Sequence, residues 1–201
     1  MSTKGPAESP AKDALRRLAL STIAVTLAIE SFAELAYAYG ALASPIRGVY
    51  LVLIAGDPPV LGALAVLVFC ERELKHRAAY LVALVAFSTA FVFVAAELLS
   101  RRVPALAALG GPAAQHLMNA GEIVGFFATL FSLHATGERP DSPSRKRRVW
   151  FAAAACTIAR AVAGFVALAR PTPLANALVA ASAAAMFFST GWVAWWSRAV
   201  E

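Results

Sequence analysis

The sequence predicts an all-α integral membrane protein that folds as a bundle of six transmembrane helices. The first observation is composition: 60% of the 201 residues are hydrophobic and only 15% are charged, whereas a soluble domain is usually about half apolar and a quarter charged. The second is that the apolar residues gather in blocks of about 20, the length that crosses a hydrocarbon core about 30 Å thick. The third is the placement of lysine and arginine between these blocks.

Six apolar blocks, rich in Ala, Leu, Val, Phe and Gly, give the predicted spans. In chain order they are 18–42, 48–70, 78–99, 113–135, 149–168 and 174–197. A β-barrel would instead show alternating segments of about 10 residues. These spans make up one transmembrane domain, 18–198, with a polar cytoplasmic loop at 136–148. The small, polar and proline-containing start of the chain predicts a disordered cytoplasmic tail at 1–17.

The first span leaves one alternative open. The letters "ALA" at 41–43 follow a basic start and could form a signal-peptidase site, in which case five spans would remain. The preceding apolar stretch is longer than the 7–15 residues of the apolar region in a usual signal peptide, and it contains two glutamates. Six spans are therefore preferred.

Basic residues gather in alternate connections. They precede the first predicted span, separate the second from the third and the fourth from the fifth, and follow the sixth: Lys4, Lys12, Arg16, Arg17, Arg72, Lys75, Arg77, Arg139, Arg145, Lys146, Arg147, Arg148 and Arg198. The other connections hold only Arg47, Arg101, Arg102 and Arg170. This asymmetry predicts a cell-membrane protein with both termini in the cytoplasm. It also explains the net charge of +6 without a nucleic-acid partner.

Two spans contain residues that shape a helix. The second contains Asp57-Pro58-Pro59; because prolines lack an amide hydrogen and Asp before Pro suits a new helix start, this span is expected to be kinked or broken there. A simple proline kink is the alternative. The fourth contains Gly121 and Gly125, a pair of small residues that predicts close helix packing.

Ionisable residues on four different spans fall at a similar depth. Glu34, Asp57, Glu122 and Arg160 each lie about 8–9 residues from the non-cytoplasmic end of their span, or roughly 12–14 Å deep at the rise of an α-helix. Glu30 is one turn deeper on the same face as Glu34. We therefore expect these groups to face one another across an interior cavity.

The free-energy cost of placing a charge in lipid makes this shared depth informative. An acid at a helix centre costs about 2.5–3.5 kcal/mol on insertion, against about 0.3–0.6 gained per large aliphatic residue. Arg160 can pair with one or two of the four carboxylates through its planar fork. The remaining acids must be protonated or must meet a cation, so at least one is expected to be protonated near neutral pH.

These residues predict a small multi-pass transporter or channel that handles a cation or protons. Glu30, Glu34, Asp57 and Glu122 would be the binding or relay groups, with His116 and Asn119 beside them on the fourth span and Arg160 as counter-charge. A metal is left open, because one histidine among acids matches no recognised metal spacing. The alternative from another class is a sensor, assembly or scaffold protein whose acids only fix helix packing. A homo-oligomer is compatible with either.

Enzymatic function is not favoured, and no cofactor is expected. The chain has no nucleophile–base motif, phosphate loop or redox cysteine pair. A b-type cytochrome that uses His76 and His134 is a third hypothesis, since both lie at cytoplasmic ends of spans. Both histidines sit in or beside charged segments, so solvated side chains are the preferred interpretation.

Overall fold

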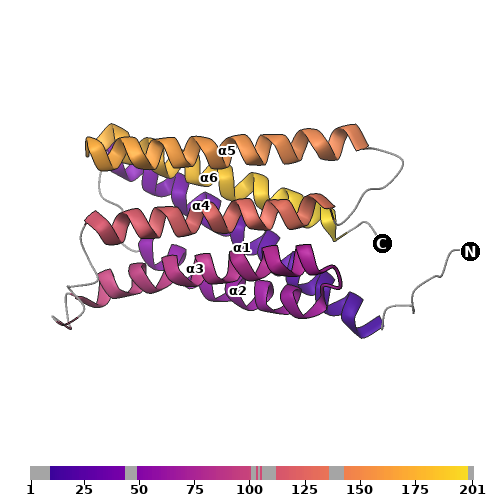
Figure 1. Cartoon of the computed structure of the whole chain (residues 1–201). Coiled ribbons are helices and arrows are strands. Elements are labelled where there is room, and N and C mark those ends of the chain that lie inside the picture. The colour runs from indigo at the N-terminus through magenta and orange to yellow at the C-terminus, as the bar shows by residue number, and fades with distance from the viewer. Residues whose placement is uncertain are drawn as a thin grey trace, which may run out of the picture.

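A computed structural model describes residues 10–43, 49–100, 103, 105, 112–135 and 143–198. Within these residues it contains six long helices and no strand (Figure 1): α1 (Pro10–Ala43), α2 (Val49–Cys70), α3 (Leu74–Ser100), α4 (Pro112–Ala135), α5 (Pro143–Ala169) and α6 (Pro173–Ser197). The prediction of an all-α protein is confirmed.

Four of the helices are long and apolar enough to cross a membrane. The qualifying stretches of the described chain are Pro10–Gly40, Leu74–Ala96, Arg147–Ala169 and Pro173–Ser197, in α1, α3, α5 and α6. The apolar stretch of α2, Ala55–Cys70, is shorter than these four. Large apolar side chains also point outward from the bundle, among them Phe32, Phe69 and Phe165. A surface of this kind suits contact with lipid better than contact with water.

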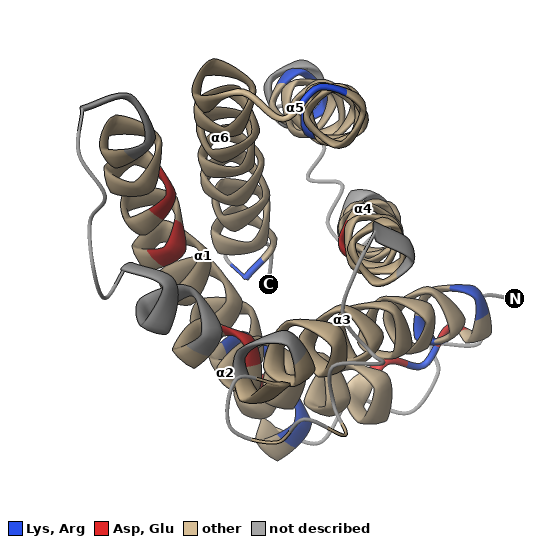
Figure 2. Cartoon of the chain, turned by 90° about the vertical axis from the view of Figure 1, so that its left-hand side faces the viewer, with Lys and Arg blue, Asp and Glu red and all other residues tan. Residues whose placement is uncertain are grey.

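The helices form a closed ring (Figure 2). Each packs against the next along the chain, and α1 packs against α6 to complete the circle. Successive helices run in opposite directions, so the start of α1 and the end of α6 lie at the same end of the bundle (Figure 1). At that end the Arg198 Nη1 atom donates a hydrogen bond to the Ser21 hydroxyl at 3.3 Å. The ring therefore gathers one face of every helix around a common interior.

The glycines of α4 bring it close to α3. A Cβ at Gly121 would stand 2.7 Å from the backbone oxygen of Ala86, and one at Gly125 would stand 2.8 Å from the ring of Phe87. At Gly121 only glycine fits without a shift of α3, and at Gly125 a larger residue would require the ring of Phe87 to move. The predicted role of this glycine pair in helix packing is confirmed.

The predicted N-terminal tail is partly wrong. Residues 10–17 belong to α1, whereas residues 1–9 lie outside the described part of the chain. Likewise, residues 143–148 of the predicted loop form the first turns of α5. The reason is the same in both cases, because Pro10 and Pro143 open their helices. Proline favours this position, where its missing amide hydrogen would have no partner in any case.

Helix α2 is not broken at Asp57-Pro58-Pro59. It is helical throughout Val49–Cys70, with both prolines inside it. The proline side chains are exposed on the outer face, whereas Val60 and Leu64 are buried in the core. Packing of that inner face supports the helix across the backbone hydrogen bonds that the prolines cannot make.

Candidate functional site

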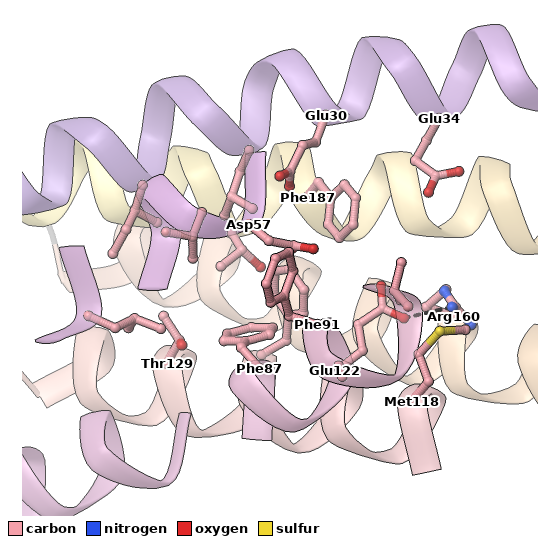
Figure 3. A pocket seen from close by; sticks show the side chains of 18 residues that line it. Glu30, Glu34, Asp57, Phe87, Phe91, Met118, Glu122, Thr129, Arg160 and Phe187 are labelled. Carbon is pink, nitrogen blue, oxygen red and sulfur yellow. Dashed lines mark hydrogen bonds and ion pairs between the residues drawn. The ribbon is translucent and has the colours of Figure 1, made fainter. Parts of the chain in front are cut away.

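The interior of the ring holds a cavity of about 170 Å³, the inner cavity, which is lined by the ionisable groups. Glu30 and Glu34 reach it from α1, Asp57 from α2, Glu122 from α4 and Arg160 from α5. Figure 3 shows these side chains converging from different helices, and Figure 2 shows the acidic positions of α1 and α4 on the sides that face the middle of the ring. The structure thus brings together on one cavity all the groups that depth matching selected. Their role as a cation or proton site stays a prediction.

Arg160 and Glu122 form an ion pair at one end of this cavity. The Arg160 Nη2 atom lies 2.6 Å from Glu122 Oε2, and the two side chains are only 6% and 17% exposed. The same nitrogen donates to the Asn119 side-chain oxygen at 3.0 Å. A Cβ at Gly164 would stand 2.7 Å from Arg160 Nη1, so this glycine makes room for the guanidinium. Arg160 is therefore committed to Glu122 rather than shared among the acids.

Glu30 is the most deeply buried carboxyl of the group. It is 4% exposed, and its Oε1 atom makes no hydrogen bond with any described residue. A Cβ at Gly56 would collide with this carboxyl, so a glycine on α2 provides the space that Glu30 occupies. A buried carboxyl without a partner is costly as an anion, which makes Glu30 the least satisfied acid in the site.

A second cavity adjoins the first toward the α5–α6 connection. Its volume is about 410 Å³, and it shares Glu34, Met118 and Arg160 with the first cavity. It extends to Pro171, which lies between α5 and α6. On the opposite side of the inner cavity the helices continue into fully buried apolar packing, which includes Leu20, Leu67, Leu130 and Leu133. The second cavity thus approaches the deep acids from the end of the bundle where the α5–α6 connection lies.

Sequence reasoning missed the aromatic wall of the inner cavity. Phe87 and Phe91 from α3, Phe126 from α4 and Phe187 from α6 all line it. The rings of Phe126 and Phe187 stack with centroids 5.3 Å apart, and Phe87 meets Phe126 edge-on at 5.0 Å. The spacing of Phe87 and Phe91, four residues apart on one helix face, is the one signal that the sequence offered.

The two polar residues predicted beside Glu122 have different places. Asn119 lines the second cavity and contacts Arg160. His116 is exposed, with its ring centroid 6.5 Å from that of Phe165, and it lines neither cavity. In the described part of the chain no three His, Cys, Asp or Glu residues are placed to hold a metal ion.

The preferred interpretation of His76 as a solvated side chain is wrong. His76 is 2% exposed, and its Nε2 atom lies 3.2 Å from Glu73 Oε2. It is buried because α3 begins at Leu74 and carries the histidine inward in its first turn. The side chain of His134 lies outside the described residues, so the cytochrome hypothesis stays a prediction that an absorption spectrum without a Soret band would end.

Comparison of the chain with protein-family models, with curated proteins and with solved structures finds no match. A helical bundle by itself supports many unrelated activities, so the chemistry of the site is what indicates a function.

Proposed function

We propose that the protein is a small multi-pass transporter or channel of the cell membrane that handles a cation or protons through Glu30, Glu34, Asp57 and Glu122. The proposal includes six transmembrane spans with both termini in the cytoplasm. Helices α2 and α4 lie in the same ring as the four helices that are long and apolar enough to cross a membrane. The positive charges between alternate spans support the orientation.

The observation that carries the proposal is the unpartnered carboxyl of Glu30. A glutamate that only stabilised the bundle would be expected to pair with a donor, because an unsatisfied buried polar group costs about 1–3 kcal/mol. The Oε1 atom of Glu30 has no such donor among the described residues, although the side chain is almost fully buried. A carboxyl kept in this state suits a group that takes up and releases a proton or a cation.

The remaining groups have distinct roles in this proposal. Arg160 keeps Glu122 paired at 2.6 Å, which leaves the other three carboxyls to bind or relay the cation. Glu34 lines both cavities and therefore lies between the second cavity and the deeper acids. The buried leucines beyond the inner cavity would close the path on the cytoplasmic side, so transport requires a conformational change there.

The alternative is a sensor, assembly or scaffold protein in which the acids only fix the helices. The ion pair of Arg160 with Glu122 and its bond to Asn119 is the observation that favours it, since such a network holds α4 against α5. The two functions differ in their response to neutral isosteres. A scaffold tolerates Glu34→Gln, which leaves the Arg160–Glu122 ion pair intact, whereas a transporter stays folded and loses flux.

The experiment places purified protein in liposomes and measures the entry of protons with an enclosed pH indicator. A potassium gradient with valinomycin supplies the driving force for protons. Sodium and potassium fluxes are measured with ion-sensitive dyes in separate liposomes without valinomycin. Size-exclusion profiles and melting temperatures in detergent establish that each variant is folded. Ion flux above that of empty liposomes, lost in folded Glu34→Gln, supports transport. Flux equal to that of empty liposomes, or flux unchanged in folded Glu34→Gln, contradicts it.

A further inference from the structure

We infer that the inner cavity binds an organic cation with an apolar body, such as an alkylammonium or arylammonium ion, and that Glu30 meets its positive charge. This inference rests on the proposed function and names the substrate class of the same site. It follows from the combination of an unpartnered buried carboxyl with aromatic walls, from the spacing of the carboxyls, which forms no metal-binding cluster among the described residues, and from the size of the cavity.

Aromatic and aliphatic side chains make up most of the wall of the inner cavity. Eleven of its 18 lining residues are apolar, and four of these are phenylalanines. Figure 3 shows the rings of Phe87, Phe91 and Phe187 beside the carboxyls of Glu30 and Asp57. Aromatic faces attract cations and are the usual surroundings of quaternary ammonium ligands. The wall therefore suits an ion whose charge lies within a hydrocarbon shell.

The carboxyls are placed to receive one such charge at the end of the cavity away from Arg160. Glu30 and Asp57 extend into the cavity from α1 and α2, and Arg160 lies apart from them beside Glu122 (Figure 3). The guanidinium is held there by its 2.6 Å contact with Glu122. A cation at Glu30 would thus gain a carboxylate partner without facing Arg160 directly.

An inorganic ion fits these walls less well. Metal cations such as Ca²⁺ take six to eight oxygen ligands, and Mg²⁺ about six. The described residues offer no cluster of three His, Cys, Asp or Glu that could hold a metal ion. Among the described residues, the oxygens that line the cavity belong to the four separate carboxyls and to the hydroxyls of Thr129 and Thr190. An organic cation needs no such shell, because its alkyl or aryl groups replace it.

The cavity also has the right size. Its volume is about 170 Å³, close to the roughly 150 Å³ of an apolar cavity that holds benzene. One aromatic ring or one small quaternary ammonium group would fill it. The adjoining cavity of about 410 Å³, reached past Glu34, would admit the ligand from the end of the bundle where the α5–α6 connection lies.

The test measures binding to the wild-type protein in lipid nanodiscs by isothermal titration calorimetry. The probes are three permanently charged cations of increasing size: tetramethylammonium, choline and benzyltrimethylammonium. The uncharged carbon isostere of choline, 3,3-dimethylbutan-1-ol, is the matched control for charge and needs no variant. We expect saturable binding of at least one cation, and choline to bind more tightly than its isostere. No saturable binding of any cation, or equal binding of choline and its isostere, overturns the inference.

Two variants then locate the ligand. Glu30→Gln should weaken binding of the best probe about tenfold or more, because a charge-assisted contact is lost. Phe187→Leu should weaken it about threefold or more by removal of an aromatic face. Phe188→Leu is the matched control, since Phe188 is 52% exposed whereas Phe187 is 8% exposed. Unchanged affinity in folded Glu30→Gln and in Phe187→Leu overturns the inference.

Measurements of flux distinguish a failure of this inference from a failure of the proposed transport function on which it rests. Inorganic cation or proton flux that depends on Glu34, without binding of any organic probe, overturns the substrate class and leaves transport intact. Probe binding that depends on Glu30, without any flux of probe, protons or inorganic cations, supports the organic-cation site and overturns transport.

Discussion

The guanidinium of Arg160 lies 2.6 Å from the carboxylate of Glu122 and joins α5 to α4 inside the bundle. Both side chains are largely buried, so each charge depends mainly on the other. Removal of one member leaves the other buried and uncompensated, which is costly even where the pair itself contributes little.

Arg160→Gln should therefore destabilise the protein by about 3–5 kcal/mol. The measurement is unfolding in detergent, followed by the loss of helical circular dichroism. Arg170→Gln is the control, because Arg170 is exposed at the end of the same helix. Equal stability of the Arg160 and Arg170 variants would show that the pair is not buried as described.

Gly56→Ala and Gly62→Ala should have opposite effects within one helix. An alanine at position 56 collides with the Glu30 carboxyl, whereas a Cβ at Gly62 meets nothing within 4 Å. The first variant should lower the melting temperature and perturb the site. The second should raise stability by about 0.5–1 kcal/mol, the usual gain of alanine over glycine in a helix. Similar melting temperatures for the two variants would contradict the position of Glu30 against α2.

Gly121→Ala should destabilise more than Gly125→Ala. The new methyl group at position 121 meets a backbone oxygen at 2.7 Å, which cannot move without a shift of α3. At position 125 it meets the ring of Phe87, and a side chain can rotate away. We expect a loss of about 1–3 kcal/mol for Gly121→Ala, measured by chemical unfolding in detergent. The reverse order would contradict the close approach of α3 and α4.

Cysteine accessibility tests the proposed orientation. Single cysteines at Ser142 and Ala105, in a background with Cys70 and Cys156 replaced, lie in connections on opposite sides of the membrane in the six-span topology. A membrane-impermeant maleimide applied to intact cells should label position 105 only, and position 142 should react after permeabilisation. Labelling of position 142 in intact cells would reverse the orientation.

The sequence was a good guide to the helices and a weaker guide to their ends. Blocks of about 20 apolar residues leave little choice but a helix in a membrane. The predicted tail includes the start of α1 because a short polar segment with prolines resembles a disordered tail, although Pro10 and Asp13 suit a first helical turn. The break expected in α2 is absent. Proline weakens an isolated helix, whereas here the packing of Val60 and Leu64 against neighbouring helices holds α2 in its helical form.

The depth of each site residue along its helix could be predicted from the sequence, but the direction in which its side chain points could not. Counting residues from the span ends selected Glu34, Asp57, Glu122 and Arg160, and all four line one cavity. His116 lies six residues from Glu122, about 120° away around the helix, and it falls on the exposed side. Phe187 and Gly56 gave no signal, because phenylalanine and glycine are common in membrane helices and only tertiary packing shows which of them face the acids.

Proton and cation flux through the Glu30→Gln variant tests the central claim most directly. Wild-type protein, Glu30→Gln and Glu71→Gln are placed in liposomes at equal density, and flux is measured after folding has been verified in detergent. Glu71 lies in the α2–α3 connection, outside both cavities. The account predicts flux in the wild type and in Glu71→Gln, and a fall to the level of empty liposomes in Glu30→Gln. Equal flux in all three proteins would contradict it.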